Sequence, residues 1–208
     1  MESRQTVWCP SHLPPPHYNA VNQSVKDGCE LHWYPMRVTY HREMKIKALL
    51  DAIGIENFLP MQWKIKVLKT GKKKRVLVST IPNLIFVRAT QQFLTELKTT
   101  HEEFEPMRYM MKRSLSGNKK SEIIIVPDKQ MANFMKVASV QDDSVMALDS
   151  KDFINSAGKR VRVIDGTFKG VEGIVKRIKN NKRVVVCLEG VAAMAITFVP
   201  PSQLEFIE

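Results

Sequence analysis

The spacing of apolar residues predicts that residues 32–140 form a domain that mixes helices with strands. A helix is predicted over residues 42–53, because apolar residues recur there at i, i+3, i+4 and i+7. A second helix is predicted from Asp128, which can cap it, and its apolar face would carry Phe134. Extended apolar or alternating runs predict strands at residues 33–39, 58–68, 75–79, 81–87, 104–111 and 123–126, with a short helix near residues 91–98.

The run at residues 81–87 is continuously apolar, as expected for a strand at the centre of a sheet. Strand alternation places Leu84 and Phe86 on one face, and Ile85 and Val87 on the other. Only two clearly amphipathic helices are predicted, and both could lie on a single face of the sheet. We therefore expect part of the opposite face to stay open, and an uncovered apolar face usually marks an interaction site.

The last fifty residues have the pattern of a small all-β unit. The stretch GKRVRVIDGTFKGVEG begins at Gly158, and its Asp165-Gly166 pair predicts a turn because glycine tolerates positive φ. Phe168 then lies on a loop, where it either plugs a barrel or faces a partner. Strands are predicted at residues 161–164, 174–178, 184–188 and 195–199, and Asn180-Asn181 is predicted to form the turn of the middle hairpin. Gly170 and Gly173, like Gly166, are expected to tolerate positive φ. This number of short strands fits an SH3-like barrel.

These patterns divide the chain into four parts. Residues 1–31 are expected to be an irregular extension, because they contain a proline run and no periodicity. Residues 32–140 form the α+β domain and residues 156–208 the barrel. Residues 141–155 are acidic and lack glycine, proline and periodicity, so we interpret them as a flexible linker.

The charge of the chain indicates an acidic partner. The formal net charge is +11 and the isoelectric point is near 9.6, which is typical of proteins that bind nucleic acid but also of some lysine-rich soluble domains. The predicted hairpin between residues 58 and 79 has a strongly basic tip. We expect this tip to contact phosphates, although such a run is often only a solvated loop. Its basic residues are Lys69, Lys72, Lys73, Lys74 and Arg75.

Three cysteines, Cys9, Cys29 and Cys187, are too few for a disulfide framework and indicate a reducing compartment. No apolar run approaches the ~20 residues of a membrane span, and no signal peptide is recognisable, so we expect a cytoplasmic protein with no membrane partner.

Two pairs of zinc-type ligands occur near the N-terminus, Cys9 with His12 and Cys29 with His32. The long gap between the pairs favours incidental residues over a metal site, so no metal or other cofactor is expected. The sequence also lacks a glycine-rich phosphate loop, a nucleophile elbow and a histidine–acid relay, which favours a non-catalytic protein.

The order V-R-V-I-D-G-x-F-K-G-x-E-G resembles the KOW domain, and what precedes it resembles the NusG family from Trp33 onward. The family layout is matched by Trp33-Tyr34, an amphipathic helix, Phe58-Leu59-Pro60, the basic hairpin and the strand from Pro82 to Val87. The resemblance implies an NGN domain, an antiparallel sheet flanked by helices, that binds the clamp coiled coil of RNA polymerase. Ile81, Leu84 and Phe86 match family positions on the clamp-binding face, although plain sheet core is the alternative.

Pro82-Asn83-Leu84 stands where general NusG proteins mostly have Pro-Gly-Tyr, and in this respect the chain is more similar to RfaH-like and UpxY-like paralogs. Those paralogs are antitermination factors, the UpxY type serving capsule-polysaccharide operons. The resemblance implies that the basic hairpin lies near upstream or non-template DNA and that Thr99, Thr100 and His101 are weaker candidates for reading an exposed DNA strand. It also implies that Phe168 contacts a small-subunit ribosomal protein or Rho. A ribosome- or RNA-binding KOW protein is the alternative function.

Overall fold

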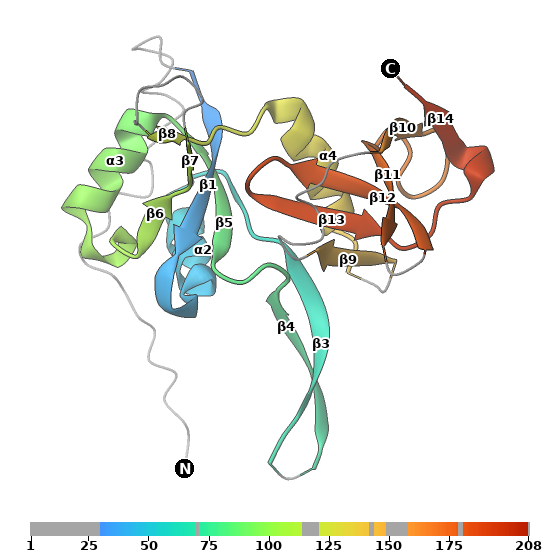
Figure 1. Ribbon diagram of the computed structural model, residues 1–208. Coiled ribbons are helices and arrows are strands. Elements are labelled where there is room, and N and C mark those ends of the chain that lie inside the picture. The colour runs from blue at the N-terminus through green and yellow to red at the C-terminus, as the bar shows by residue number, and fades with distance from the viewer. Residues whose placement is uncertain are drawn as a thin grey trace.

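The computed structural model describes residues 30–69, 71–113, 121–141, 144–148, 158–178 and 181–207. Its first part contains a four-stranded antiparallel sheet with β1 and β5 at the centre (Figure 1). The prediction of an α+β unit with an antiparallel sheet flanked by helices is confirmed. The strands, in spatial order, are β2 (Asn57–Phe58), β5 (Leu84–Ala89), β1 (His32–Val38) and β6 (Met107–Tyr109).

Among the described residues, this part contains three α-helices, namely α2 (Glu43–Ala52), α3 (Gln91–Thr100) and α4 (Asp128–Ala138), and two short 3-10 helices. The helices α2 and α3 cover one face of the sheet, where Ile85 packs with Leu50 and Leu94. The side chain of Thr90 caps α3 by accepting a 3.2 Å hydrogen bond from the Phe93 N–H.

Helix α4 covers the opposite face, where Phe86 packs with Met131 and Phe134. Leu84 and Phe86 therefore share one face, and Ile85 and Val87 share the other, as the alternation predicts. The expectation that α2 and α4 lie on the same face is wrong. The reason is that α3, predicted only as a short helix, buries Phe93, Leu94 and Leu97 and fills the place beside α2, which leaves α4 to cover the second face.

Two hairpins lie outside the main sheet. Strands β3 (Met61–Val67) and β4 (Lys73–Ser79) pair from Met61 opposite Ser79 to Val67 opposite Lys73. They form a two-stranded sheet that projects away from the rest of the molecule (Figure 1). The strand predicted at residues 104–111 is instead the 3-10 helix η2 (Glu102–Phe104) followed by β6 and β7 (Met111–Arg113), and β7 pairs with β8 (Ser121–Ile123).

The last part is a six-stranded antiparallel sheet. Its ends, β14 and β9, do not pair in the described residues, so closure into an SH3-like barrel is not confirmed. The strand predicted at residues 195–199 is displaced toward the N-terminus, and of the Asn180-Asn181 turn only Asn181 is described, as a strand residue. In spatial order the strands are β14 (Leu204–Phe206), β10 (Lys159–Val163), β11 (Glu172–Ile178), β12 (Asn181–Leu188), β13 (Ala192–Ile196) and β9 (Val145–Leu148).

Strand β9 comes from the segment that the sequence predicts to be a linker. Val145 and Leu148 are buried, and the strand pairs with β13, for example Met146 opposite Ala195. The prediction of a linker without secondary structure is therefore wrong at Val145–Leu148. Four residues are too few to show a periodicity, and only the neighbouring strand reveals that they are extended.

The glycines after β10 have two different structural roles. Gly166 and Gly170 adopt φ of 80° and 86°, the left-handed region that the predicted turn requires. Gly173 instead lies within β11, where an added Cβ would approach the Val185 carbonyl oxygen to 2.7 Å. It therefore permits the close approach of β12 rather than a turn.

Helix α4 stands between the two main sheets and contacts both (Figure 1). The Lys129 ammonium on α4 forms a 2.9 Å ion pair with Glu172 of β11, which also pairs with Arg162 at 2.9 Å. Lys136 donates a hydrogen bond to the Lys169 carbonyl oxygen. One apolar cluster thus continues from the first sheet through α4 into the C-terminal sheet. Within the described residues, no helix is both long enough and apolar enough to cross a bilayer.

Candidate functional site

The β3–β4 hairpin concentrates the positive charge of the chain. Residues 61–79 contain seven cations and no acidic residue, so this segment carries +7 of the formal +11. All seven side chains are exposed, and within the described residues no ion pair joins any of them to a carboxylate. The cations are Lys64, Lys66, Lys69, Lys72, Lys73, Lys74 and Arg75.

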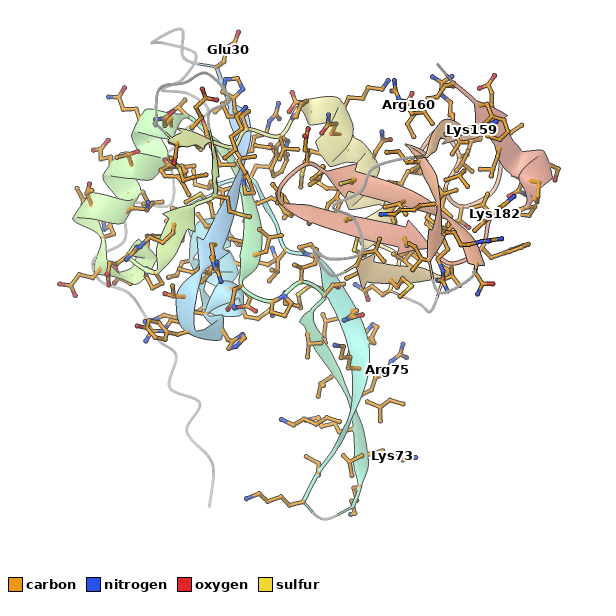
Figure 2. All side chains as sticks on the ribbon, viewed as in Figure 1. Glu30, Lys73, Arg75, Lys159, Arg160 and Lys182 are labelled. Carbon is orange, nitrogen blue, oxygen red and sulfur yellow. The ribbon has the colours of Figure 1, made fainter. Side chains whose placement is uncertain are left out.

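The register of the hairpin sorts these residues onto two faces. On one face, Trp63 lies opposite Leu77, Ile65 opposite Arg75 and Val67 opposite Lys73. The guanidinium of Arg75 lies 5.0 Å from the centre of the Trp63 ring. Lys73 and Arg75 extend to the same side of the ribbon (Figure 2). The reverse face carries Lys64, Lys66 and Lys74 beside Val76 and Val78.

The apolar residues of the first face were not predicted to be functional, whereas Lys73 and Arg75 on it were, and the apolar residues are largely solvent-exposed. Trp63, Ile65 and Val67 keep 42%, 70% and 60% of their accessible surface, and Leu77 is also exposed. We call Trp63, Ile65, Val67 and Leu77 the apolar hairpin face. A signal in the sequence could have indicated the apolar hairpin face. It is the alternation W-K-I-K-V in one strand, combined with three consecutive basic residues in the partner strand.

The residues predicted to form an open polymerase-binding patch are mostly buried. Phe86 is fully buried, and its ring centre lies 5.4 Å from that of Phe134 and 6.5 Å from that of Phe58. Leu84 is buried in the same cluster, and only Ile81 is partly exposed. The prediction of an uncovered patch centred on Phe86 is therefore wrong, because α4 packs over it.

A strained turn precedes the same strand. Asn83 adopts φ of 61°, and Tyr40 and His41 also have positive φ. The His41 N–H donates to the Asn83 side-chain oxygen at 3.3 Å, and the Asn83 N–H donates to Glu43 at 3.4 Å. The left-handed conformation is one that glycine and asparagine tolerate best, which is a physical reason why Asn83 can occupy this turn.

The candidates for reading DNA lie at the end of α3, away from the hairpin (Figure 1). Thr99 and Thr100 belong to the last helical turn, and both hydroxyls donate to the carbonyl oxygen of Glu96, at 3.0 and 2.8 Å. His101 follows the helix and is half-buried. The structure therefore does not bring these three residues together with the basic hairpin.

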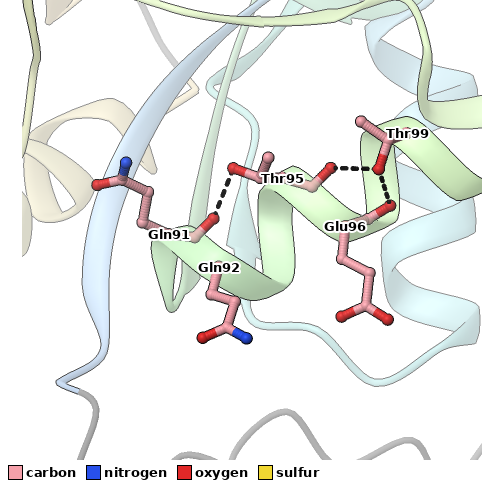
Figure 3. Close-up of a pocket in the computed structure, with 5 residues that line it drawn as sticks. All are labelled: Gln91, Gln92, Thr95, Glu96 and Thr99. Carbon is pink, nitrogen blue, oxygen red and sulfur yellow. Dashed lines mark hydrogen bonds between the residues drawn. The ribbon is translucent and has the colours of Figure 1, made fainter.

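The outer side of α3 also carries a shallow hollow (Figure 3). Its threonine hydroxyls donate to backbone carbonyls of the same helix, Thr95 to Gln91 at 2.8 Å and Thr99 to Thr95 at 3.0 Å. Glu96 places a carboxylate there, which disfavours a phosphate. Nearby, Lys98 lies 4.5 Å from the centre of the Tyr109 ring, and burial, with the charge of Arg108, lowers the pKa of its ammonium. The hollow is a weaker candidate for nucleic acid than the hairpin.

Of the two alternatives for Phe168, an exposed partner contact and a plug of the apolar core, the structure favours the plug, because only 8% of its surface is accessible. It joins the cluster that contains Phe134 and Met131 of α4. The expectation of exposure is wrong, because the loop from Gly166 to Gly170 folds back on the apolar cluster, with Lys136 bonded to the adjacent carbonyl.

The possible zinc ligands Cys9, His12 and Cys29 lie outside the described residues. His32 begins β1, and its ring lies 3.8 Å from the carboxylate of Glu30. In the part of the chain that the structure describes, no three potential metal ligands gather.

A comparison with protein families identifies the first domain. The model described as NusG, transcription termination factor nusG, matches residues 31–135, from the start of β1 into α4 and including the hairpin. It does not extend to the C-terminal sheet, so the KOW assignment stays a prediction. A search of curated proteins returned no match. Because the match covers half of the chain, the protein belongs to the NusG family, whose members are non-catalytic transcription elongation and termination factors.

Proposed function

We propose that this protein regulates transcription elongation by binding RNA polymerase through residues 32–140 and by placing the β3–β4 hairpin against DNA beside the transcription bubble. The observation that carries this proposal is the concentration of seven exposed cations, none of them in an ion pair with a carboxylate of the described residues, on one projection of a NusG-family domain. Contacts from lysine and arginine to phosphates release counterions and are independent of sequence. The hairpin would therefore strengthen and orient binding without selecting a DNA sequence.

Membership of the family supports RNA polymerase as the protein partner, and we propose the clamp coiled coil as the contact. Within the predicted patch, Ile81 is the residue that a partner can reach in the described arrangement. Leu84 and Phe86 lie beneath α4, so they support the surface and can touch a partner only if α4 leaves the sheet.

We further propose that the protein is a specialised paralog, similar to the RfaH and UpxY types, that promotes antitermination on an operon such as one for capsule polysaccharide. The supporting observation is the Pro82-Asn83-Leu84 sequence, whose asparagine has the backbone conformation that glycine would otherwise supply. We propose that the C-terminal sheet is a KOW domain and that Phe168 contacts a ribosomal protein or Rho. That contact requires Phe168 to leave the cluster that now buries it.

The test uses elongation complexes assembled from purified RNA polymerase on a DNA–RNA scaffold with an open bubble. Replacing Lys72, Lys73 and Lys74 by glutamine should weaken binding. It should also reduce the slope of log K against log salt by about 2 to 3, because each lost contact to duplex phosphate removes about 0.9. Binding to polymerase without nucleic acid should not change.

A control with the same charge change separates the hairpin from net charge. Lys159, Lys169 and Lys182 are exposed in the C-terminal part, and their replacement by glutamine should leave the salt slope near that of the parent. Equal losses in both variants would show that overall charge, and not the hairpin, determines the affinity. An unchanged slope in the hairpin variant would contradict the proposal.

A further inference from the structure

The apolar hairpin face has no cover within the described residues. The β3–β4 pair is a separate two-stranded sheet, and neither Trp63 nor Ile65 belongs to any of the buried clusters. Phosphate contacts do not explain this face, since lysine and arginine alone would serve that purpose. Exposed apolar surface of this kind on a soluble domain usually marks a binding site.

The chemistry around the face restricts what can occupy it. A partner must offer flat apolar groups to Trp63 and, at the same time, negative charge to Arg75, Lys73 and the lysines of the reverse face. In a DNA duplex, the flat surfaces of the bases are covered by their neighbours, so a side chain meets phosphates and base edges instead. In an unpaired strand, the base surfaces are accessible and alternate with phosphates.

We propose that the apolar hairpin face binds single-stranded DNA, with a base stacked on Trp63 and its flanking phosphates held by Arg75 and Lys73. The inference rests on the proposed function, which places the hairpin beside the open DNA of the transcription bubble. The stacked Arg75 keeps its charge next to the ring, at 5.0 Å, where a phosphate adjacent to the stacked base would lie. Ile65 and Val67 continue the face toward the tip over about 13 Å, at the usual rise of a strand.

The consequence is a preference for unpaired over paired DNA. Phosphate contacts act on both forms, whereas stacking is available only in the unpaired form. Because aromatic rings stack on any base, the preference should be independent of sequence. The hairpin would then hold the protein at the edge of the bubble rather than along the duplex.

The experiment measures binding of the full chain to fluorescently labelled oligonucleotides: a single-stranded DNA, the same sequence as a duplex, and the same sequence as single-stranded RNA. Trp63→Ala should weaken single-stranded DNA binding about tenfold, the usual effect of removing one stacking ring, and should leave duplex binding unchanged. Trp63→Phe should retain most of the affinity. Phe198→Ala, which removes an exposed aromatic ring far from the hairpin in the sequence, is the matched control and should have no effect.

Several outcomes would overturn the proposal. They are no loss in Trp63→Ala, an equal loss on single-stranded and duplex DNA, tighter binding of the parent to RNA than to DNA, or Trp63-dependent binding to anionic phosphatidylserine vesicles but not to DNA. Circular dichroism must match that of the parent, and Trp63→Phe provides a second variant if Trp63→Ala does not fold. Failure of the proposed function would give a different result. The variant with Lys72, Lys73 and Lys74 replaced would then bind elongation complexes as tightly as the parent, regardless of how the Trp63 variants bind free DNA.

Discussion

Strands β5 and β3 belong to the same domain, yet the apolar side chains of β5 are buried and most of those of β3 are exposed. In β5, Phe86 and Ile85 point to opposite faces and both are fully buried. In β3, Ile65 points to a face that no described element covers, and it remains mostly exposed. A continuously apolar strand is typical of burial on both faces, and β5 follows that rule. An alternating strand is typically buried on one face, but neither face of β3 is buried.

The neighbours of each strand account for the difference. Strand β5 lies between β1 and β2, and helices cover it on both sides. Among the described strands, β3 pairs with β4 alone, and the pair and its connecting loop carry seven cations. Packing this ribbon against the body of the protein would remove the water around several of these charges, which costs more than the burial of the four side chains of the apolar hairpin face returns. An exposed apolar strand next to dense charge therefore points to a binding surface rather than to core.

The largest expected effect is that of Phe86→Ala, which should lower the free energy of unfolding by about 3–5 kcal/mol because it leaves a cavity beside Phe134. Ile65→Ala, on the exposed hairpin, should change it by less than about 0.5 kcal/mol. Urea unfolding of the two variants measures the contrast. Similar values for both variants would mean that β5 is not the buried strand described here.

The next largest effect on stability is expected at Phe168. Loop residues often contact partners, but Phe168 is buried, as Phe86 is. Phe168→Ala should cost about 3 kcal/mol, measured by thermal unfolding. Phe206→Ala, in the exposed strand β14, is the matched control and should leave the melting temperature close to that of the parent. A parent-like melting temperature for Phe168→Ala would instead support a freely accessible contact residue.

The smallest expected effect is a pH dependence at the contact between α4 and the C-terminal sheet. The hydrogen bond from Lys129, followed by that from Arg162, lowers the pKa of the Glu172 carboxyl below its ordinary value of 4.5. A carboxyl with a lowered pKa in the folded state stabilises the protein above its ordinary pKa, and this contribution is lost as the pH falls through the folded value.

Glu172→Gln should therefore lower stability by about 1 kcal/mol or less near neutral pH, and the difference from the parent should disappear as the pH falls below 4.5 and through the lowered pKa of the folded state. Melting temperatures across this range measure the effect. A difference that persists at the lowest pH would show that the glutamine disturbs packing rather than the two ion pairs.

The amino-acid sequence by itself determined the local features of this protein. Helical spacing located α4 over the residues that form it, and alternation assigned Leu84 and Phe86 to one face of β5. The glycines at positions 166 and 170 indicated the turn, and the layout from Trp33 onward indicated the NusG family. These features depend on residues close together in the chain, whose spacing dictates which side chains share a face.

Only the tertiary structure decided what covers each face. Helix α4 follows Phe86 by about forty residues and returns to bury it, and β9 joins the edge of a sheet whose other strands come later in the chain. The same kind of long-range packing buries Phe168 and leaves the apolar face at Trp63 open. Periodicity states which side chains point the same way, but burial depends on whether a distant element packs there, and such packing leaves no local pattern in the sequence.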